Sequence, residues 1–207
     1  MFFNCNDIKK FFILIVTCLW MASCISKEES DSEICFVGDS IIYLWDLEYY
    51  FPNETIVKHA VIGAVVQDFD KWDLSDCENK KTVVLIGTNN LGRDRIVDSD
   101  AASHRTSFIK EYKKRILAMH VDQLIAVSLL PRNSSYSQDS TVNMNIQQLN
   151  RELHDTLRTM NINFKYVDVF DKFIDKDYKI KMDYFDDGLH PSKAGYDVLA
   201  REVEKKL

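Results

Sequence analysis

Residues 34–40 read Ile-Cys-Phe-Val-Gly-Asp-Ser, a short apolar run that ends in Gly38-Asp39-Ser40. The run is continuously apolar rather than alternating, which is typical of a strand covered on both faces in a parallel sheet. We therefore expect residues 34–37 to form a buried strand. Gly38 lets the chain turn sharply, because glycine has no Cβ. Ser40 would then begin the following helix, with its hydroxyl presented at the end of the strand.

Four further apolar runs predict strands, at residues 56–62, 82–86, 124–130 and 164–169. Apolar side chains at helical spacing predict helices over residues 103–120 and 144–161, and a last helix with Ser192 as its N-cap. Strands that alternate with helices predict a right-handed, three-layer α/β/α sandwich around a parallel sheet. Ligands bind at the carboxyl ends of the strands in such folds, so the residues found there are the candidate site.

Two of these positions offer a nucleophile and its base. Ser40 follows the first strand, and Asp187-Gly188-Leu189-His190-Pro191 precedes the last helix. A serine is a poor nucleophile until a base takes its proton, and a histidine base needs a carboxylate to fix its tautomer. Asp187 and His190, three residues apart on a loop with a glycine, fit these two roles. Asp183 and Asp186 remain alternative carboxylates.

Two other strand ends offer groups that stabilise a developing negative charge. The second strand runs into Gly63, where a backbone N–H can approach a ligand closely, and the third is followed by Gly87-Thr88-Asn89-Asn90. A side-chain amide such as that of Asn89 is a candidate oxyanion donor. Each of these positions taken alone fits ordinary turn chemistry equally well. Together, the four strand ends supply the parts of one acyl-transfer site.

These four segments resemble the conserved blocks of the GDSL/SGNH hydrolase family. Gly87-Thr88-Asn89-Asn90 and Leu129-Leu130-Pro131-Arg132 are most similar to the platelet-activating-factor acetylhydrolase catalytic-subunit type. The resemblance implies the SGNH hydrolase fold, a flavodoxin-like five-stranded parallel sheet with strand order 2-1-3-4-5. It also implies a catalytic triad and an oxyanion hole and no cofactor. The residues that it assigns are Ser40, Asp187 and His190 as the triad, with Ser40, Gly63 and Asn89 as the oxyanion hole.

The sequence departs from the family pattern at three supporting positions. Lys58 stands where the second block often has asparagine, Ala60 replaces a common glycine, and Asn90 replaces a more frequent aspartate. These residues support loops, so they put the loop geometry in question rather than the chemistry.

The N-terminus differs in composition from the rest of the chain. Two lysines precede an uncharged stretch over residues 11–25, which is too short for a membrane span and typical of a signal peptide. Met21-Ala22-Ser23-Cys24 resembles a bacterial lipobox, although leucine is more usual than Met21. We therefore expect residues 1–23 to be a lipoprotein signal peptide, Cys24 to carry lipid and residues 24–32 to form a flexible tether. The hydrolase domain would cover residues 33–207, in an exported, membrane-anchored bacterial lipoprotein on the periplasmic or cell-surface face.

Cysteines and charge restrict the other classes of function. Only Cys35 and Cys77 lie within the expected domain, and the sequence leaves open whether they pair. The remaining histidines are scattered, so we expect surface or capped side chains and no metal site; they are His59, His104, His120 and His154. A net charge of -6 and the lack of a dense basic run argue against a nucleic-acid partner.

The expected activity is hydrolysis of short-chain esters, with O-acetyl groups on carbohydrate as the favoured substrate. Tyr43 and Trp45 fit either the acyl pocket or the core, and the polar loops after the third and fourth strands are expected at its mouth. We expect the charged side chains in these loops to be solvated; they are Arg93, Arg95 and Arg132. Contact with an anionic substrate is the alternative. The alternative functions are a lysophospholipase or short-chain lipid esterase, a lipid-anchored binding protein without catalysis, and a flavodoxin-like electron carrier. The last would need a phosphate-binding loop that residues 38–40 do not supply.

Overall fold

The computed structural model of the protein describes residues 33–92, 100–133 and 140–207. Its centre is a five-stranded sheet in the order β2-β1-β3-β4-β5, with every neighbouring pair parallel. The predicted fold class and strand order are therefore confirmed. The strands are β1 (Glu33–Gly38), β2 (Thr55–Ala60), β3 (Lys81–Leu85), β4 (Gln123–Val127) and β5 (Phe164–Val167).

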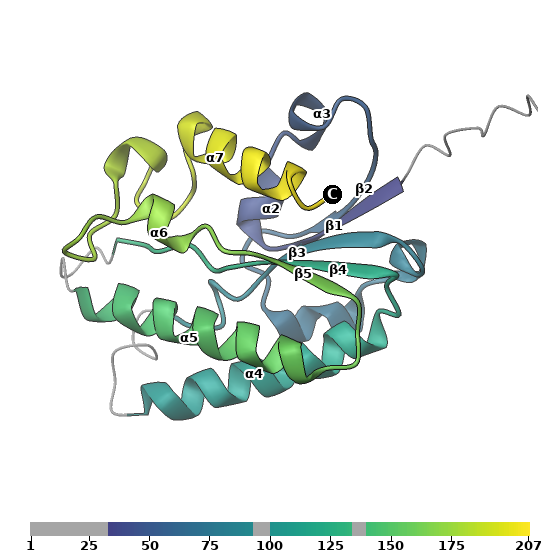
Figure 1. Cartoon of the computed structure of the whole chain (residues 1–207), viewed down its shortest axis with the longest axis horizontal. Coiled ribbons are helices and arrows are strands. Elements are labelled where there is room, and N and C mark those ends of the chain that lie inside the picture. Colours follow the sequence, from purple (N-terminus) through teal and green to yellow (C-terminus); the bar gives the residue numbers. More distant parts are fainter. Residues whose placement is uncertain (1–32, 93–99, 134–139) are drawn as a thin grey trace, which may run out of the picture. The chain divides into compact units, whose positions relative to one another are not determined.

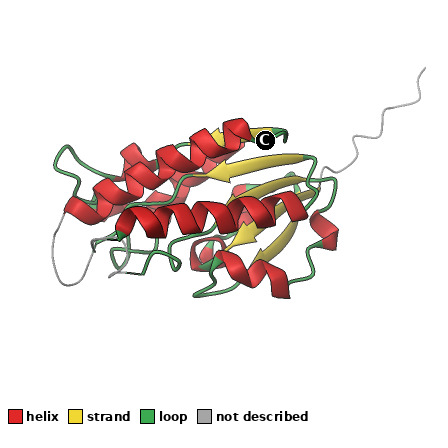
Figure 2. Ribbon diagram, turned by 90° about the horizontal axis from the view of Figure 1, so that it is seen from below, coloured by secondary structure: helices red, strands yellow, loops and turns green. Residues whose placement is uncertain are grey.

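Helices cover both faces of this sheet (Figure 1). The two longest, α4 (Ala101–Ala118) and α5 (Ser140–Thr159), lie on one face. The other face carries α7 (Lys193–Glu204) together with α2 (Ser40–Leu44), α3 (Leu47–Tyr50) and α6 (Phe170–Phe173). Figure 2 shows the same arrangement from below, with helices packed along the strands.

The connection between β2 and β3 departs from the predicted alternation. Residues 61–80 contain only two 3₁₀ segments, η1 (Val66–Lys71) and η2 (Ser75–Cys77). The segment is short and broken by aspartates, whose side chains bond nearby backbone N–H groups and so compete with an α-helix. Asp73 Oδ1, for example, accepts from Ser75 N at 3.1 Å. A third 3₁₀ segment, η3 (Met182–Tyr184), precedes the last helix.

The two faces of β1 show why the strand is apolar throughout. Phe36 packs edge-on against Trp45, whose ring lies 5.7 Å from that of Tyr196 in α7. On the opposite face Cys35 forms a disulfide with Cys77 of η2, with their Cα atoms 5.5 Å apart. The pairing that the sequence left open is therefore present. Trp45 is fully buried, so of the two interpretations of this aromatic the structure selects the core.

Several strands end earlier than their apolar runs. β4 stops at Val127 because Leu129 bonds instead to the buried amide of Asn150, which accepts from Leu129 N at 2.8 Å and donates to its carbonyl at 2.9 Å. β2 stops at Ala60, and Val61 accepts from Ala64 N in a turn. The carboxyl ends of the strands matter because the candidate site residues lie in the loops that follow them. Ser192 caps α7 as predicted, accepting from Gly195 N at 3.4 Å.

The contacts divide the chain into two units, residues 1–32 and residues 33–207. The predicted signal peptide, Cys24 and the predicted tether lie outside the described residues. No helix within the described ranges has both the length and the apolar character that crossing a membrane requires.

Candidate active site

Ser40 is placed by a tight junction between β1 and α2. Gly38 leaves no room for a side chain, because a Cβ there would overlap the Leu85 carbonyl oxygen and the Ile42 side chain. Asp39 is the N-cap of α2, and its Oδ1 accepts from Ile41 N at 3.1 Å. Ser40 therefore becomes the first residue of α2, at the carboxyl end of β1, as the sequence predicts.

His190 reaches Ser40 across 150 residues of chain. Its Nε2 lies 3.0 Å from Ser40 Oγ, within hydrogen-bond distance of the group that a base must deprotonate. Its Nδ1 lies 2.7 Å from Asp187 Oδ2. The structure thus brings together all three residues that the sequence assigned to a triad.

The loop from Asp187 to His190 is held by its own carboxylate. Asp187 Oδ1 accepts from the backbone N–H of Leu189 at 2.9 Å and of His190 at 2.7 Å, leaving Oδ2 for the imidazole. Partial burial opposes the charge on Asp187, but the hydrogen bonds from His190 and Leu189 outweigh it and lower its pKa to about 2. This carboxyl is therefore ionised at neutral pH.

The two alternative carboxylates do not take this place. The backbone N–H of Asp186 donates to the His190 carbonyl at 3.0 Å, and the carbonyl of Asp183 accepts from Ser192 Oγ at 2.7 Å. Both residues thus join the loop through their backbones. Asp187 is the one whose side chain orients the imidazole.

Asp39 is a buried carboxyl directly beside Ser40. Its residue is 0% exposed, and Oδ2 has no hydrogen-bond partner among the described residues. Burial raises the pKa of Asp39 to about 6, against the opposing effects of the Ile41, Gly87 and Thr88 N–H groups and of His190. The ionisation of Asp39 therefore depends on the loop after β3 and on the charge of His190.

One hydrogen bond links the loop of Asn89 to the turn that contains Gly63. Asn89 Nδ2 donates to the carbonyl of Ala64 at 2.9 Å, which ties the loop after β3 to the turn that contains Gly63. Gly63 has a φ of 79°, a conformation that glycine adopts readily and side-chain-bearing residues rarely do. An amide nitrogen carries two hydrogens, so Asn89 retains a second donor after bonding Ala64.

The departures from the family pattern have structural roles in these loops. Asn90 Oδ1 accepts from Val66 N at 2.9 Å and its Nδ2 donates to Gln67 Oε1 at 2.8 Å. Lys58 Nζ donates to the carbonyls of Tyr43 at 2.8 Å and Trp45 at 2.9 Å, at the end of α2. Both residues bind neighbouring loop backbone, so they support the site without lying in it.

Arg132 supports the loop after β3 through hydrogen bonds to its backbone. Its environment differs from the one expected from the sequence. It is buried, with Nη1 donating to the Thr88 carbonyl at 3.1 Å and Nη2 to that of Leu91. Its backbone N–H donates to Asn143 Oδ1 at 2.9 Å. It is therefore neither a solvated loop charge nor placed at the mouth. The one sequence feature that could have indicated its burial is that Arg132 follows the apolar run 124–130 after only one residue, Pro131.

Other predicted contributors lie in different environments. Tyr43 is 51% exposed and so available to a ligand, unlike Trp45. Arg93 and Arg95, and parts of both polar loops expected at the mouth, lie outside the described residues.

The arrangement has the chemistry of nucleophilic acyl transfer. A serine hydroxyl touches an imidazole, which touches an ionised carboxylate, and amide donors stand on the neighbouring strand ends. In general, a serine hydroxyl is activated as a nucleophile when it contacts an imidazole that a carboxylate orients.

Comparison with known proteins agrees with this geometry. The profile of the GDSL-like Lipase/Acylhydrolase family matches residues 36–198, which include the first and last site residues. No curated protein sequence matches the chain.

Solved structures show the same fold at low sequence identity. A Streptococcus pneumonia protein described as a candidate platelet activating factor is 24% identical, with a TM-score of 0.63 over 99% of this chain and 99% of that one. A GDSL-like lipase from Bacteroides thetaiotaomicron is 17% identical, with a TM-score of 0.66 over 91% of this chain and 94% of that one. An acetyl xylan esterase from Geobacillus stearothermophilus is 16% identical, with a TM-score of 0.55 over 84% of this chain and 94% of that one.

Proposed function

Because this chain belongs to the GDSL-like lipase/acylhydrolase family and is an ester hydrolase, we propose that it cleaves short-chain esters through an acyl-enzyme formed on Ser40. The single observation that carries the mechanism is the chain of contacts from Ser40 Oγ to His190 Nε2, at 3.0 Å, and from His190 Nδ1 to Asp187 Oδ2, at 2.7 Å.

In the first half of the reaction, Ser40 Oγ attacks the ester carbonyl while His190 Nε2 accepts its proton. Asp187 keeps Nδ1 protonated and stabilises the imidazolium that forms. The N–H groups of Ser40 and Gly63 and the side-chain amide of Asn89 receive the negative charge on the carbonyl oxygen. His190 then donates its proton to the leaving alcohol.

In the second half, water cleaves the acyl-enzyme. His190 takes a proton from the water, the hydroxide adds to the acyl carbon, and the same donors hold the second oxyanion. Collapse of this intermediate releases the carboxylic acid and returns the proton from His190 to Ser40 Oγ. All the atoms required are supplied by the ester, water and these side chains.

For the substrate we favour acetyl groups on carbohydrate. Residues 33–207 form one compact unit, and a small acyl group suits a site on a unit of this size. The similar fold of an enzyme described as an acetyl xylan esterase supports the same class of substrate. Acetate release from acetylated oligosaccharides tests this, and release from none of them contradicts it.

The mechanism is tested by hydrolysis of p-nitrophenyl esters from acetate to octanoate. Ser40→Ala should lose turnover while Ser107→Ala, an exposed serine of α4, keeps it. Equal activity in Ser40→Ala would assign the nucleophile elsewhere. A well-folded wild type inactive on every ester would favour a binding protein that retains the fold.

A lipid esterase is the second candidate, and one observation favours it. Two large apolar side chains directly precede Gly63 and are exposed, Val61 at 50% and Ile62 at 62%, and Tyr43 lies exposed on α2. Apolar surface of this kind next to a site suits a longer acyl chain. Highest activity on octanoate would select this alternative, and highest activity on acetate would exclude it.

We also propose export as a lipoprotein, from the sequence of residues 1–32 alone. The uncharged stretch over residues 11–25 ends in Met21-Ala22-Ser23-Cys24, which supports cleavage before Cys24 and its lipidation. Such a protein meets membrane through a lipid at Cys24 rather than through a membrane-spanning helix. Metabolic labelling with palmitate should mark the wild type and not Cys24→Ala, and label retained in that variant would contradict the proposal.

A further inference from the structure

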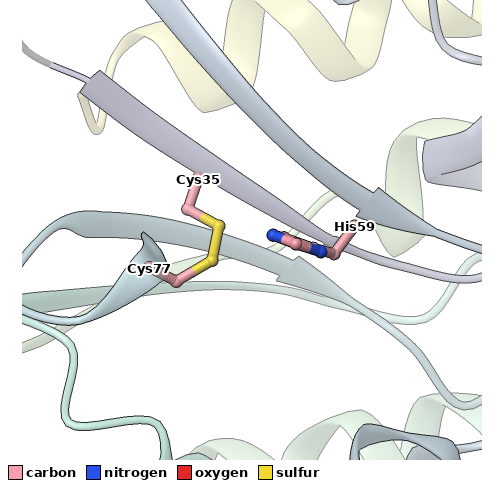
Figure 3. Close-up of side chains that lie close together, drawn as sticks. All are labelled: Cys35, His59 and Cys77. Carbon is pink, nitrogen blue, oxygen red and sulfur yellow. A yellow bond between two sulfur atoms is a disulfide. The ribbon is translucent and has the colours of Figure 1, made fainter. Parts of the chain in front are cut away.

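Three side chains that commonly bind metals lie together in the loop-and-sheet region around β1. They are Cys35 in β1, His59 in β2 and Cys77 in η2, and their donor atoms all lie within 4.8 Å of one another. Figure 3 shows the His59 imidazole directed toward the two sulfur atoms. From the sequence, no metal site is expected and His59 is expected to be a surface or capped histidine; the fold is what brings the three side chains together.

The sheet register explains the juxtaposition. Cys35 pairs with Val57, and His59 pairs with Val37, so Cys35 and His59 are diagonal neighbours on adjacent strands. Side chains two positions apart along a strand share one face, which places both on the side opposite Phe36. η2 then returns over this face and supplies Cys77. The three residues are separated by long stretches of chain, so no short motif announces them.

A fourth donor completes the set. Asp76 Oδ1 lies 2.7 Å from His59 Nε2 and 3.8 Å from Cys77 Sγ. Two sulfurs, an imidazole nitrogen and a carboxylate oxygen are donors that Zn²⁺ takes in tetrahedral sites. With Zn–S near 2.3 Å and Zn–N near 2.0 Å, such ligand atoms stand on the order of 3.5 Å apart. His59 Nε2 and Asp76 Oδ1 already lie close together, whereas the two sulfurs must separate once their bond is reduced.

The oxidation state of the sulfurs decides whether this set can bind. In the structure the two sulfurs are bonded to each other as a disulfide. Cysteine binds metals as the thiolate, so the disulfide must be reduced before the cluster can bind one. We propose that reduction of the Cys35–Cys77 disulfide converts the cluster into a Zn²⁺ site, with Cys35, Cys77 and His59 as ligands and Asp76 as the fourth. A dithiol reductant supplies two electrons and two protons to give two thiols and is itself oxidised to a disulfide. Zn²⁺ then displaces both thiol protons.

Burial indicates a structural rather than a catalytic metal. Cys35 and Cys77 are each 0% exposed, which closes the site to a substrate. Structural zinc sites are four-coordinate and closed, whereas catalytic ones keep an open position. The site shares no residue with the proposed triad or oxyanion hole, so it is independent of the ester hydrolysis. In either oxidation state the cluster fastens η2 to β1, by a covalent bond or by a metal.

The test uses Co²⁺ as a probe that absorbs visible light in tetrahedral thiolate sites. The full chain is unfolded in guanidinium chloride with a phosphine reductant, which reaches the buried sulfurs, and is refolded with Co²⁺. We expect one equivalent to bind with a sulfur-to-cobalt charge-transfer band, and Zn²⁺ to displace it. The chain refolded without reductant should show no such band.

Variants separate this site from adventitious binding. Cys77→Ser should abolish the band, and His59→Ala should weaken Co²⁺ binding at least about tenfold, since even outer partners of a ligand are worth about 10–100-fold. His154→Ala, which removes a histidine stacked on Tyr166 far along the chain, is the matched control and should bind as the wild type.

Thermal unfolding measurements distinguish a variant that has lost metal binding from one that has not folded. Zn²⁺ should raise the Tm of the reduced wild type more than that of reduced His59→Ala at the same Zn²⁺ concentration. The proposal is overturned if the reduced, folded chain gives no charge-transfer band. Equal binding by Cys77→Ser, or a reduced chain that does not fold even with Zn²⁺, also overturns it.

Discussion

The two halves of the candidate active site are built in different ways. The base side is local, because Asp187 bonds the backbone and ring of a histidine three residues away. The oxyanion side is assembled from distant segments, with Asn89 bonded to Ala64 and Arg132 bonded to Thr88. A local half depends on one short loop, whereas an assembled half depends on several elements that must pack together. We therefore expect a single substitution to lower kcat more on the base side, at Asp187 or His190, than on the oxyanion side.

The largest expected effect is on the base side, at Asp187. Asp187→Asn keeps an oxygen for the Leu189 and His190 N–H groups but presents an amide to the imidazole, which favours the wrong tautomer. We expect kcat to fall by about 10⁴, or about 5.5 kcal/mol of transition-state stabilisation. The measurement is steady-state hydrolysis of p-nitrophenyl acetate. Asp186→Asn, on the same loop, is the control and should stay near wild type; the reverse result would reassign the carboxylate.

The matching change on the oxyanion side is Asn89→Ala. It removes one donor to the oxyanion and also the bond to Ala64, and we expect kcat to fall by about 10²–10³ with little change in KM. The same assay measures it. A fall as large as that of Asp187→Asn would show that the oxyanion side is as critical as the base side, and the proposed contrast would be lost.

Asp39 lies between the two halves and predicts a dependence of stability on pH. The pKa of Asp39 is about 6 in the fold against 3.8 ordinarily, so the folded state holds its proton longer as pH rises. The free energy of unfolding should therefore fall by up to about 3 kcal/mol as the pH rises from about 4 to about 6. Above about pH 6, Asp39 should cause no further change in stability.

Asp39→Asn tests this dependence by denaturant unfolding at a series of pH values. The variant should lack that part of the fall, so its stability relative to the wild type rises from pH 4 to pH 7. Asp186→Asn removes an exposed carboxyl instead and should retain the fall. Parallel curves for wild type and Asp39→Asn would rule out Asp39 as the source.

The smallest expected effect is at a supporting residue of the oxyanion side. Asn90→Asp restores the family's more frequent residue and keeps the acceptor for Val66 N, but loses the donor to Gln67. We expect a loss of about 0.5–1.5 kcal/mol in the free energy of unfolding and less than about threefold in kcat. Denaturant midpoints and p-nitrophenyl acetate turnover measure the two. A loss like that of Asn89→Ala would make Asn90 part of the site itself.

The same contrast explains what the sequence predicts. Five apolar runs predict the strands and a parallel sheet, because hydrophobic periodicity is a local signal. The order of the strands was implied by the family resemblance and not by these runs. The Ser40, Asp187 and His190 positions follow from strand ends and a short loop. The exact strand ends were less predictable: β4 stops at Val127 because Asn150, on a distant helix, takes the hydrogen bonds of Leu129.

Residues that act through tertiary contacts were the ones missed. Arg132 was expected in solvent or at the mouth, and only the fold shows it buried against the carbonyls of Thr88 and Leu91. Between β2 and β3, where an α-helix was expected, side chains such as Asp73 bond nearby backbone and so compete with a helix. Likewise, His59 joins Cys35 and Cys77 only through the register of β1 and β2. Such contacts carry no periodic or short-range signature.

The separation of Ser40 from His190 has a consequence for when the protein can first act. The two residues are 150 positions apart, and a ribosome adds about 5–20 residues each second. Roughly 8–30 s therefore pass between synthesis of the nucleophile and synthesis of its base. Under the proposed mechanism, the nascent chain carries a serine without its base throughout that interval, and esterase activity should begin only after His190 has been synthesised.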